Sequence, residues 1–399
     1  MLAEAQEARW NAGAAAVRVG VTRLVLTDFR NYRELRLTLG TAPVVLTGPN
    51  GAGKTNLLEA VSFLAPGRGL RRATLAEIDR RREAGGADPP VGELSGWAVS
   101  ALVATGRGPL RVGTGHDGTA NERRVVRIDG EPARGQAALG ERLGVLWLTP
   151  AMDRLFAEGP SGRRRFLDRL VLGLDPAHAA RVAAYEQALR ERARLLRDGP
   201  ADPAWLAAIE EVMAEKGVAV AAGRRDAVQR LDRECRGAEG PFPRARMRLV
   251  GTVEDWLDAM PALAAEARLA AALAGNRRSD AQAGATSIGP HRSDLRVVMA
   301  EKGVPAELAS TGEQKALLIS ILFAHAGLQR ALRGEAPLLL LDEIAAHLDA
   351  GRRAALFDAL LRLDSQAWLT GTEEALFAPL RCRAQFLSVR DGNLTAASS

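Results

Sequence analysis

The chain has 399 residues, 47% of them hydrophobic and 26% charged, which is enough for two or three domains around a sizeable core. Its two cysteines, Cys235 and Cys382, lie far apart in the sequence, which argues against a disulfide framework or a zinc site and favours a reducing cytoplasm. No apolar run approaches the roughly 20 residues that span a bilayer, so no membrane partner is expected. Residues 1–19 lack the apolar segment of a secretory signal and are interpreted as an N-terminal extension.

The formal net charge is +6 and the pI about 9.9, and only four of the 54 cations are lysines. This charge is compatible with a nucleic-acid partner and equally with a solvated basic surface. Aromatic residues make up only 4% of the chain, which disfavours binding of single strands by base stacking. We therefore expect any DNA binding to use phosphate contacts and to weaken with salt.

Strands are predicted in the first part of the chain. Residues 21–29 and 34–39 alternate apolar and polar side chains, and residues 44–46 form a short, continuous apolar run. A glycine-rich loop follows, and a helical pattern runs from Asn56 to Leu64. Further strands are expected among glycine-rich turns at residues 97–103, 124–128 and 145–149.

Helical patterns dominate from Ser161 to about Leu273. Asp175-Pro176 and Asp202-Pro203 each have the pattern of an N-cap followed by proline in the first turn. A third helix is predicted to carry Trp256, Leu257, Met260, Leu269 and Leu273. The apolar spacing is too short and irregular for a long coiled coil, so a compact helical insert is expected.

Strand patterns return at residues 295–299, 338–341, 367–370 and 385–389. The predicted architecture is an α/β head split in two by a helical domain. Its expected parts are an extension at 1–19, a first head half at 20–150, a helical arm at 151–280 and a second head half at 281–399.

The glycine-rich loop matches the pattern G-x-x-x-x-G-K-[ST] between an apolar strand and a helix. Its backbone N–H groups and the helix N-terminus would face phosphates, Lys54 would reach the β- and γ-phosphates, and Thr55 would hold Mg²⁺. The structural alternative is a glycine turn at the start of a helix. The predicted ATP-binding residues are Gly48, Pro49, Asn50, Gly51, Ala52, Gly53, Lys54 and Thr55.

Four leucines at residues 338–341 lead into Asp342 and Glu343. Ligands in open α/β sheets bind at the carboxyl ends of strands, where this acidic pair would lie. Asp342 is predicted to contact Mg²⁺ through its waters, and Glu343 to orient or deprotonate the attacking water. Alone this run is a weak signal, but together with the glycine-rich loop it indicates one nucleotide site with Lys54 and Glu343 as catalytic residues.

A third motif, Ser310-Thr-Gly-Glu313, precedes a long helical pattern. Ser310 and Glu313 alone would make a capping box. The functional alternative is that Ser310, the Gly312 amide and the helix N-terminus grip a γ-phosphate. Its position shortly before the acidic strand favours this second interpretation. His347-Leu-Asp349 follows the acidic pair, and Trp368–Thr372 ends another strand beside the presumed γ-phosphate.

The order of these pieces resembles that of ABC-type ATPases. The resemblance implies a head-to-tail homodimer, with ATP between the phosphate loop of one subunit and the Ser310–Gly312 motif of the other, including Glu313. It also implies that Asp349 lies at the dimer contact.

Within that class the chain resembles the RecF family, over about residues 20–390. Four stretches carry the likeness: Leu26–Tyr32 ("FRNY"), Gly67–Arg72, Gly159–Asp168 and Gly289–Asp294 ("GPHRSD"). The chain differs from the family in its extension before residue 20, in its Asp-Glu acidic pair and in having Glu313 where the family has glutamine. No Q-loop glutamine is evident near residues 146–150.

The RecF resemblance implies a slow ATPase that closes over duplex or gapped DNA with a RecR-type mediator partner. It implies roles in single-strand gap repair, replication restart and SOS induction, in the cytoplasm at the nucleoid. Two alternatives share the motifs. A transporter ATPase subunit normally has a smaller helical insert and no "FRNY" opening, and an SMC-type ATPase needs a far longer coiled coil.

Several basic residues outside the motifs leave two interpretations open. The cluster Arg163–Arg165 fits either DNA contacts or the first turn of a solvated helix. Arg71 and Arg72 could contact nucleotide or DNA, whereas Arg80–Arg82 are expected to be solvated. His291 and Arg292 could form a structural turn or a site that links the two domains. Tryptophans at helical spacing are expected in the core.

Overall fold

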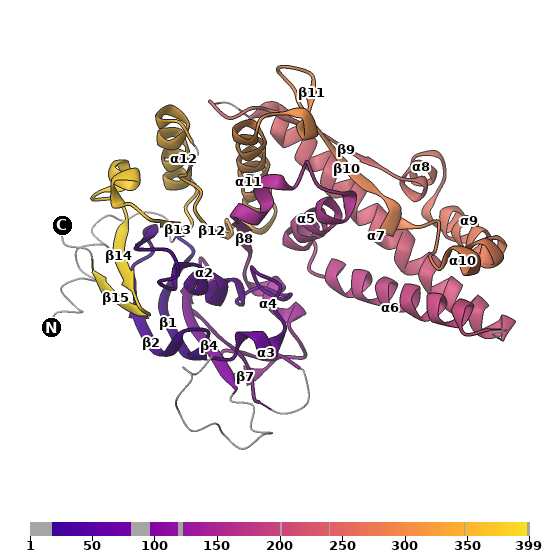
Figure 1. Cartoon of the computed structure of the whole chain (residues 1–399), viewed down its shortest axis with the longest axis horizontal. Helices are drawn as coiled ribbons and strands as arrows, with labels where there is room; N and C mark the ends of the chain where they lie inside the picture. Colours follow the sequence, from indigo (N-terminus) through magenta and orange to yellow (C-terminus); the bar gives the residue numbers. More distant parts are fainter. Residues whose placement is uncertain are drawn as a thin grey trace. The chain divides into compact units, whose positions relative to one another are not determined.

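A computed structural model describes residues 18–80, 96–118, 123–199, 202–238, 240–346 and 348–396. The predicted extension therefore lies, except for its last two residues, outside the described part, and so does His347. The chain divides into two compact units (Figure 1): the first contains residues 1–152 and 329–399, and the second residues 153–328.

The described part of the first unit contains two sheets of six strands. One is antiparallel, in the order β2 (Tyr32–Thr38), β1 (Gly20–Phe29), β4 (Trp97–Ala104), β5 (Leu110–His116), β6 (Val125–Ile128) and β7 (Glu131–Pro132). Its strands alternate buried and exposed side chains, as expected of a sheet with one face on the core. Phe29, Phe63 and Trp97 meet in that core, with ring centroids 5.1 to 6.0 Å apart.

The second sheet carries the nucleotide motifs. Its order is β15 (Asn393–Ala396), β14 (Gln385–Arg390), β3 (Val44–Thr47), β13 (Ala367–Gly371), β12 (Leu338–Leu341) and β8 (Val145–Leu148). All neighbours pair in parallel except β15 with β14. Every residue of β3, β12, β13 and β8 is buried, as in a sheet covered on both faces. The described part of this unit contains the helices α2 (Lys54–Ser62), α3 (Leu75–Ile78), α4 (Ala137–Arg142) and α12 (Ala350–Arg362), besides the last residues of a helix that begins in the second unit.

The second unit is mainly helical. Its helices are α5 (Pro160–Leu174), α6 (His178–Arg197), α7 (Pro203–Gly237), α8 (Thr252–Ala259), α9 (Ala262–Gly275), α10 (Arg277–Ala283) and most of α11 (Thr311–Arg333). The long α7 packs beside α6 and α9 (Figure 1). Buried side chains of these helices form a core in this unit, among them Met213 and Ala221 of α7 and Leu269 of α9.

A three-stranded antiparallel sheet lies in the same unit, in the order β11 (Val304–Pro305), β10 (Asp294–Met299) and β9 (Ala245–Val250). β9 lies against α7, and the Met247 amide donates to the Asp232 carboxylate at 2.8 Å. The strand predicted at residues 295–299 therefore pairs within the helical unit. The structural division thus differs from the predicted one, because this unit continues beyond residue 280 to Leu328.

Some predicted helix details were wrong. α6 begins at His178, because Asp175 caps the end of α5 and its carboxylate accepts from the Ala177 amide. The single helix expected around Trp256–Leu273 is two helices, since Pro261 follows the end of α8. Trp205 is 50% exposed rather than in the core. The N-cap predicted at Asp202 is present, and its side chain accepts from the Ala204 amide.

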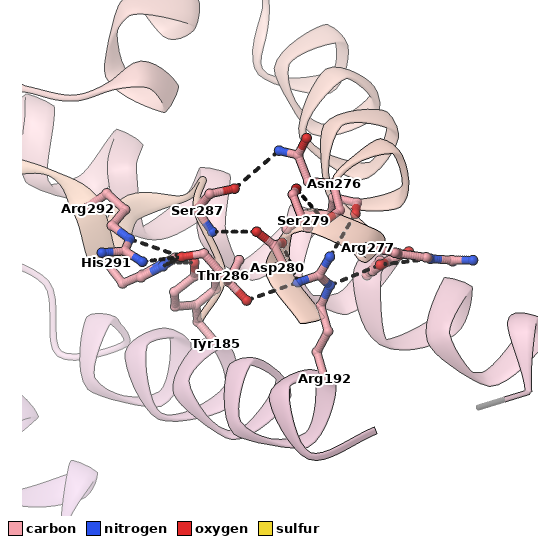
Figure 2. A network of polar contacts seen from close by, with 12 residues as sticks. Tyr185, Arg192, Asn276, Arg277, Ser279, Asp280, Thr286, Ser287, His291 and Arg292 are labelled. Atoms are coloured by element: carbon pink, nitrogen blue, oxygen red, sulfur yellow. Dashed lines mark hydrogen bonds and ion pairs between the residues drawn. The ribbon is translucent and has the colours of Figure 1, made fainter. Parts of the chain in front are cut away.

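A network of buried charges joins the helices of the second unit (Figure 2). The Arg192 side chain is fully buried and donates to the Glu210 carboxylate at 2.9 Å and to the Asp280 carboxylate at 2.8 Å. It also donates to the Thr286 hydroxyl, and Arg277 pairs with Glu210. Each charge thus has a partner of opposite sign, as buried charges require. The network ties α10 and the following turn to α6 and α7.

In the part of the chain that the structure describes, one helix, α11, is long and apolar enough to cross a membrane. About two thirds of its most apolar window (67%) is buried inside the structure, as in a core helix. This helix is therefore weak evidence for a membrane span.

Candidate nucleotide-binding site

The glycine-rich loop connects β3 to α2 within the second sheet of the first unit. Gly48 has φ +144°, and a Cβ there would lie 2.1 Å from the Val389 carbonyl oxygen. Gly53 has φ +111°, and a Cβ there would lie 2.6 Å from both the Asn31 amide nitrogen and the Tyr32 hydroxyl. Both positions therefore require glycine, for backbone conformation and for space.

Lys54 is folded back onto its own loop. Its ammonium donates to the carbonyls of Gly48 at 2.7 Å and Pro49 at 2.8 Å, and the side chain is buried. Burial lowers the pKa of Lys54, while the charges of Glu343 and Asp342 partly offset this effect. The ammonium is thus a buried cation inside the loop, available to exchange loop carbonyls for phosphate oxygens.

Thr55 and Asp342, almost 300 residues apart in sequence, are in direct contact. The Thr55 hydroxyl lies 3.0 and 3.2 Å from the two carboxylate oxygens of Asp342. The order of strands explains this, since β13 alone separates β3 from β12 and all three are parallel. Their carboxyl ends meet at one edge, where the loop and the acidic pair emerge.

Thr370, at the end of β13, connects the two acidic residues. Its buried hydroxyl donates to the Asp342 carboxylate at 2.7 Å and accepts from the Glu343 amide at 2.8 Å. The sequence predicted that this strand end lies beside the γ-phosphate but gave Thr370 no role. The structure thus adds a residue that orients Asp342 and anchors the backbone of Glu343.

Glu343 has an unusual backbone conformation, with φ +49° in the left-handed region. Non-glycine residues adopt this conformation rarely, and it recurs at functional sites where the surroundings enforce it. Here the enforcing contact is the bond from its amide to Thr370. The half-buried Glu343 carboxylate lies close enough to Lys54 to favour the charged ammonium.

The side chains present fit a magnesium-bound triphosphate. Among the described residues, no group of three or more aspartate, glutamate, histidine or cysteine side chains is placed to hold a metal ion. The paired Thr55 hydroxyl and Asp342 carboxylate instead supply two hard oxygen donors. Mg²⁺ commonly takes one or two protein ligands and completes its shell with phosphate oxygens and water. The site therefore suits a cation that arrives with its nucleotide.

A second layer of residues from the "FRNY" turn supports the loop. The buried Tyr32 hydroxyl donates to the Gly53 carbonyl at 3.1 Å, and burial raises the pKa of Tyr32. Asn31 accepts from the Asn56 side chain at 2.7 Å. Sequence analysis used this stretch only as a family resemblance. Its proximity to the loop has no local sequence signal, because β1 and β2 belong to the other sheet.

Arg30 of the same turn forms a two-point ion pair with Glu59 of α2, at 2.7 and 2.8 Å, and the Glu59 side chain is fully buried. Arg71 donates to the Asn56 side chain at 2.7 Å and lies 3.5 Å from Glu59. The helix that opens at Lys54 is therefore fixed by two arginines. The sequence left open whether Arg71 contacts nucleotide or DNA, and the contacts of Arg71 in the structure are with the phosphate-loop helix.

Ser310, Gly312 and Glu313 lie in the other compact unit, at the start of α11. Ser310 and Glu313 form the capping box: the Ser310 amide donates to the Glu313 carboxylate at 2.9 Å, and the Glu313 amide donates to the Ser310 hydroxyl. Ser310 is exposed. Asp349 is also exposed and is the N-cap of α12, where it accepts from the Arg352 amide at 2.8 Å.

Some of the basic residues whose role the sequence left open have structural contacts. Arg163 is buried and forms a two-point ion pair with Asp294, at 2.7 and 2.9 Å, so it is not available to DNA. Arg164 donates to the Ser293 carbonyl, whereas Arg165 is exposed. His291 and Arg292 both bond the Thr286 carbonyl in a short turn within the second unit (Figure 2). These contacts are those of a structural turn.

Comparison with known proteins shows the family. A family model described as "AAA domain, putative AbiEii toxin, Type IV TA system" matches residues 44–93, which include the phosphate loop. The chain is 50% identical over 380 residues to "DNA replication and repair protein RecF" of Rhizobium etli (strain CIAT 652), covering 94% of this chain and 99% of the relative. It is also 50% identical over 381 residues to the protein of that name from Brucella suis biovar 1 (strain 1330), covering 95% and 96%.

The chain belongs to the RecF family of DNA replication and repair proteins. Among solved structures, the "recombination mediator protein RecF-ATPrS in RecFOR pathway" superposes with a TM-score of 0.81, covering 97% of this chain and 100% of that one at 19% identity. An Smc head domain from Pyrococcus furiosus gives a TM-score of 0.52 at 15% identity, covering 96% of each chain. The predicted fold, an α/β P-loop ATPase head with a helical region, and the predicted family are thus confirmed. The transporter alternative is excluded, because RecF relatives match nearly the whole chain.

Proposed function

We propose that this RecF-family protein is an ATP-dependent DNA-binding clamp, which acts in recombinational repair of single-strand gaps, replication restart and SOS induction. The observation that carries the proposal is the contact of Thr55 with Asp342, itself held by Thr370. This contact joins two segments that are distant in the sequence at one sheet edge, beside a phosphate loop whose lysine donates to the loop's own carbonyls.

In this proposal ATP lies along Gly48–Thr55, and the loop amides and the α2 N-terminus face its phosphates. Lys54 leaves its carbonyl partners for the β- and γ-phosphates. Thr55 would hold Mg²⁺ and Asp342 would contact it through its waters, and the cation would supply charge compensation at the phosphates. Glu343, held in place by its backbone, orients or deprotonates the attacking water. The protein is thus a slow ATPase in which hydrolysis times the opening of the clamp.

The second half of the ATP site comes from another copy of the chain. Ser310, the Gly312 amide and Glu313 of one subunit would contact the γ-phosphate held by its partner, and Asp349 would lie at the dimer contact. Both Ser310 and Asp349 are exposed, as an intersubunit contact requires of a free monomer. ATP binding is therefore expected to drive homodimer formation.

DNA would be bound as duplex or gapped duplex, mainly through its phosphates, because the chain is basic and poor in aromatic residues. A related solved protein is named as a mediator of the RecFOR pathway, which supports a RecR-type partner for this chain as well. We place the protein in the cytoplasm, at the nucleoid.

Sedimentation tests this proposal, with and without ATP and Mg²⁺, with and without gapped duplex DNA, and at two salt concentrations. We expect a shift from monomer to dimer with ATP, and DNA binding that falls steeply with salt. Lys54→Met should abolish the ATP-driven shift while the variant stays folded. Dimerisation of Lys54→Met with ATP equal to that of the wild type would contradict the assigned site.

A further inference from the structure

Lys302 lies in the turn between β10 and β11, in the same compact unit as the Ser310 motif. Its ammonium is 2.5 Å from the Oε1 of Glu313, in the first turn of α11. The Lys302 side chain is 60% exposed and that of Glu313 only 21%. A flexible, exposed lysine is thus turned back onto a partly covered carboxylate of the motif.

The other oxygen of Glu313 is occupied by Ser310. Oε2 accepts from the Ser310 amide at 2.9 Å and from the Ser310 hydroxyl at 2.8 Å. Bonds from Lys302 and from the amide and hydroxyl of Ser310 lower the pKa of the Glu313 carboxyl to about 2. The carboxylate is therefore charged at any working pH, and it lies against the hydroxyl that the proposed function directs at a γ-phosphate.

A bare carboxylate at this position would oppose that function. It would repel the phosphate charge of a partner's nucleotide and would compete with it for the Ser310 proton. Among the described residues, Lys302 is the one cation paired with Glu313. Two glutamates near Lys302 in the sequence pair with arginines instead, Glu301 with Arg244 and Glu307 with Arg296.

We propose that Lys302 is a positioning residue of the intersubunit ATP site, which neutralises Glu313 and so permits Ser310 to meet a partner's nucleotide. The inference rests on the proposed function of Ser310 and adds a residue to it. Lys302 acts through Glu313 and does not itself contact ATP. Its effect therefore depends on the charge at position 313.

A double-mutant cycle tests this dependence. The measured quantity is the dimerisation constant with ATP and Mg²⁺ and without DNA, alongside ATP affinity of the monomer. Lys302→Ala should weaken dimerisation by about tenfold, as expected for one uncompensated charge near a phosphate at the protein surface. Lys302→Arg, which keeps the charge, should dimerise as the wild type does. ATP affinity of the monomer should stay unchanged in both variants.

The deciding comparison is made in the Glu313→Gln background, where no carboxylate needs compensation. Lys302→Ala should then have an effect of less than about twofold. An undiminished effect would mean that Lys302 contacts the nucleotide or the partner directly, and would overturn the inference. No effect of Lys302→Ala in the wild-type background would overturn it as well.

Ser310→Arg separates this inference from the proposed function. If that variant dimerises with ATP as the wild type does, the intersubunit role of Ser310 is wrong, and the inference falls with it. If Ser310→Arg fails to dimerise but the Lys302 cycle is additive, the proposed function stands and the role of Lys302 alone is refuted.

Discussion

Asp342 is the residue on which the nucleotide site depends, because two hydroxyls, one from helix α2 and one from strand β13, converge on its carboxylate. One of them, from Thr55, would share a cation with it, while the other, from Thr370, is buried and remains fixed to it. The same Thr370 oxygen accepts a hydrogen bond from the Glu343 amide. One hydroxyl therefore orients both the Asp342 carboxylate and the backbone of Glu343.

Thr370→Val removes this hydroxyl with little change in shape. The Glu343 amide would lose its acceptor, and we expect a loss of unfolding free energy of about 1–3 kcal/mol. ATP hydrolysis should fall more strongly than ATP affinity, because Glu343 would lose its fixed backbone. Steady-state hydrolysis and equilibrium ATP binding check this, with Thr370→Ser as the control that keeps the hydroxyl. Equal losses in both measurements would show that Thr370 supports binding alone.

His291 predicts a pH dependence of stability in the second unit. Its Nε2–H donates to the Thr286 carbonyl and its Nδ1 accepts from the Tyr185 hydroxyl, an arrangement of the neutral ring. Burial, with the nearby Arg292 charge, lowers the pKa of His291, although the Thr286 carbonyl opposes this. Because the folded pKa lies below the unfolded one, its contribution is complete above pH about 6.5 and is lost as the pH falls below it.

Denaturant unfolding at pH 5, 6, 7 and 8 measures this contribution. The free energy of unfolding of the wild type should fall more steeply between pH 7 and pH 5 than that of His291→Asn, which has no titrating ring. Parallel slopes for the two proteins would rule out His291 as the source of the decline.

At the scale of elements, sequence patterns predicted the strands that lead into the phosphate loop and the acidic pair. The continuous apolar runs at residues 44–46 and 338–341 predicted buried strands, and both strands lie in the parallel sheet. The adjacency of β13 to both strands follows from the sheet order, which no local pattern encodes. The roles of Thr370 and Tyr32 were missed for that reason, since each acts on a residue that is distant in sequence.

The three-stranded sheet of the second unit was also missed, although its signal was present. Residues 245–250 alternate buried Ala245 and Met247 with exposed Arg246 and Arg248, which is a strand pattern. The stretch was assigned to the helical insert because helical spacing dominates on both sides. Strand β10 pairs with β9, and it therefore belongs to the second unit and not to the head half predicted at residues 281–399.

The ion pair of Arg163 with Asp294 joins α5 to β10, so we expect it to stabilise the packing of this helix on this strand. Removing Arg163 leaves Asp294 with Arg296, at 3.0 Å, as its remaining cation partner. Arg163→Ala should therefore lower the free energy of unfolding by about 1–3 kcal/mol. Arg165→Ala is the matched control on the same helix, and since Arg165 is exposed its effect on stability should be small. Thermal unfolding of both variants checks this, and equal stability would contradict the structural role of Arg163.

At the scale of the whole molecule, the proposed site is complete only in a dimer. The phosphate loop, Asp342 and Glu343 belong to the first compact unit and the Ser310 motif to the second. A head-to-tail dimer of two identical chains would contain two such composite sites, so each subunit contributes a different half to each site. A variant damaged in one half can therefore be complemented by a variant damaged in the other.

Mixing Lys54→Met and Ser310→Arg subunits tests this central claim most directly. Each variant alone should fail to dimerise with ATP, because both of its sites are damaged. Ser310→Arg should still bind ATP as a monomer. In the mixed dimer one site combines an intact Lys54 with an intact Ser310, so we predict an ATP-dependent heterodimer by sedimentation. No heterodimer at any mixing ratio, with both variants folded and ATP still bound by Ser310→Arg, would contradict the account.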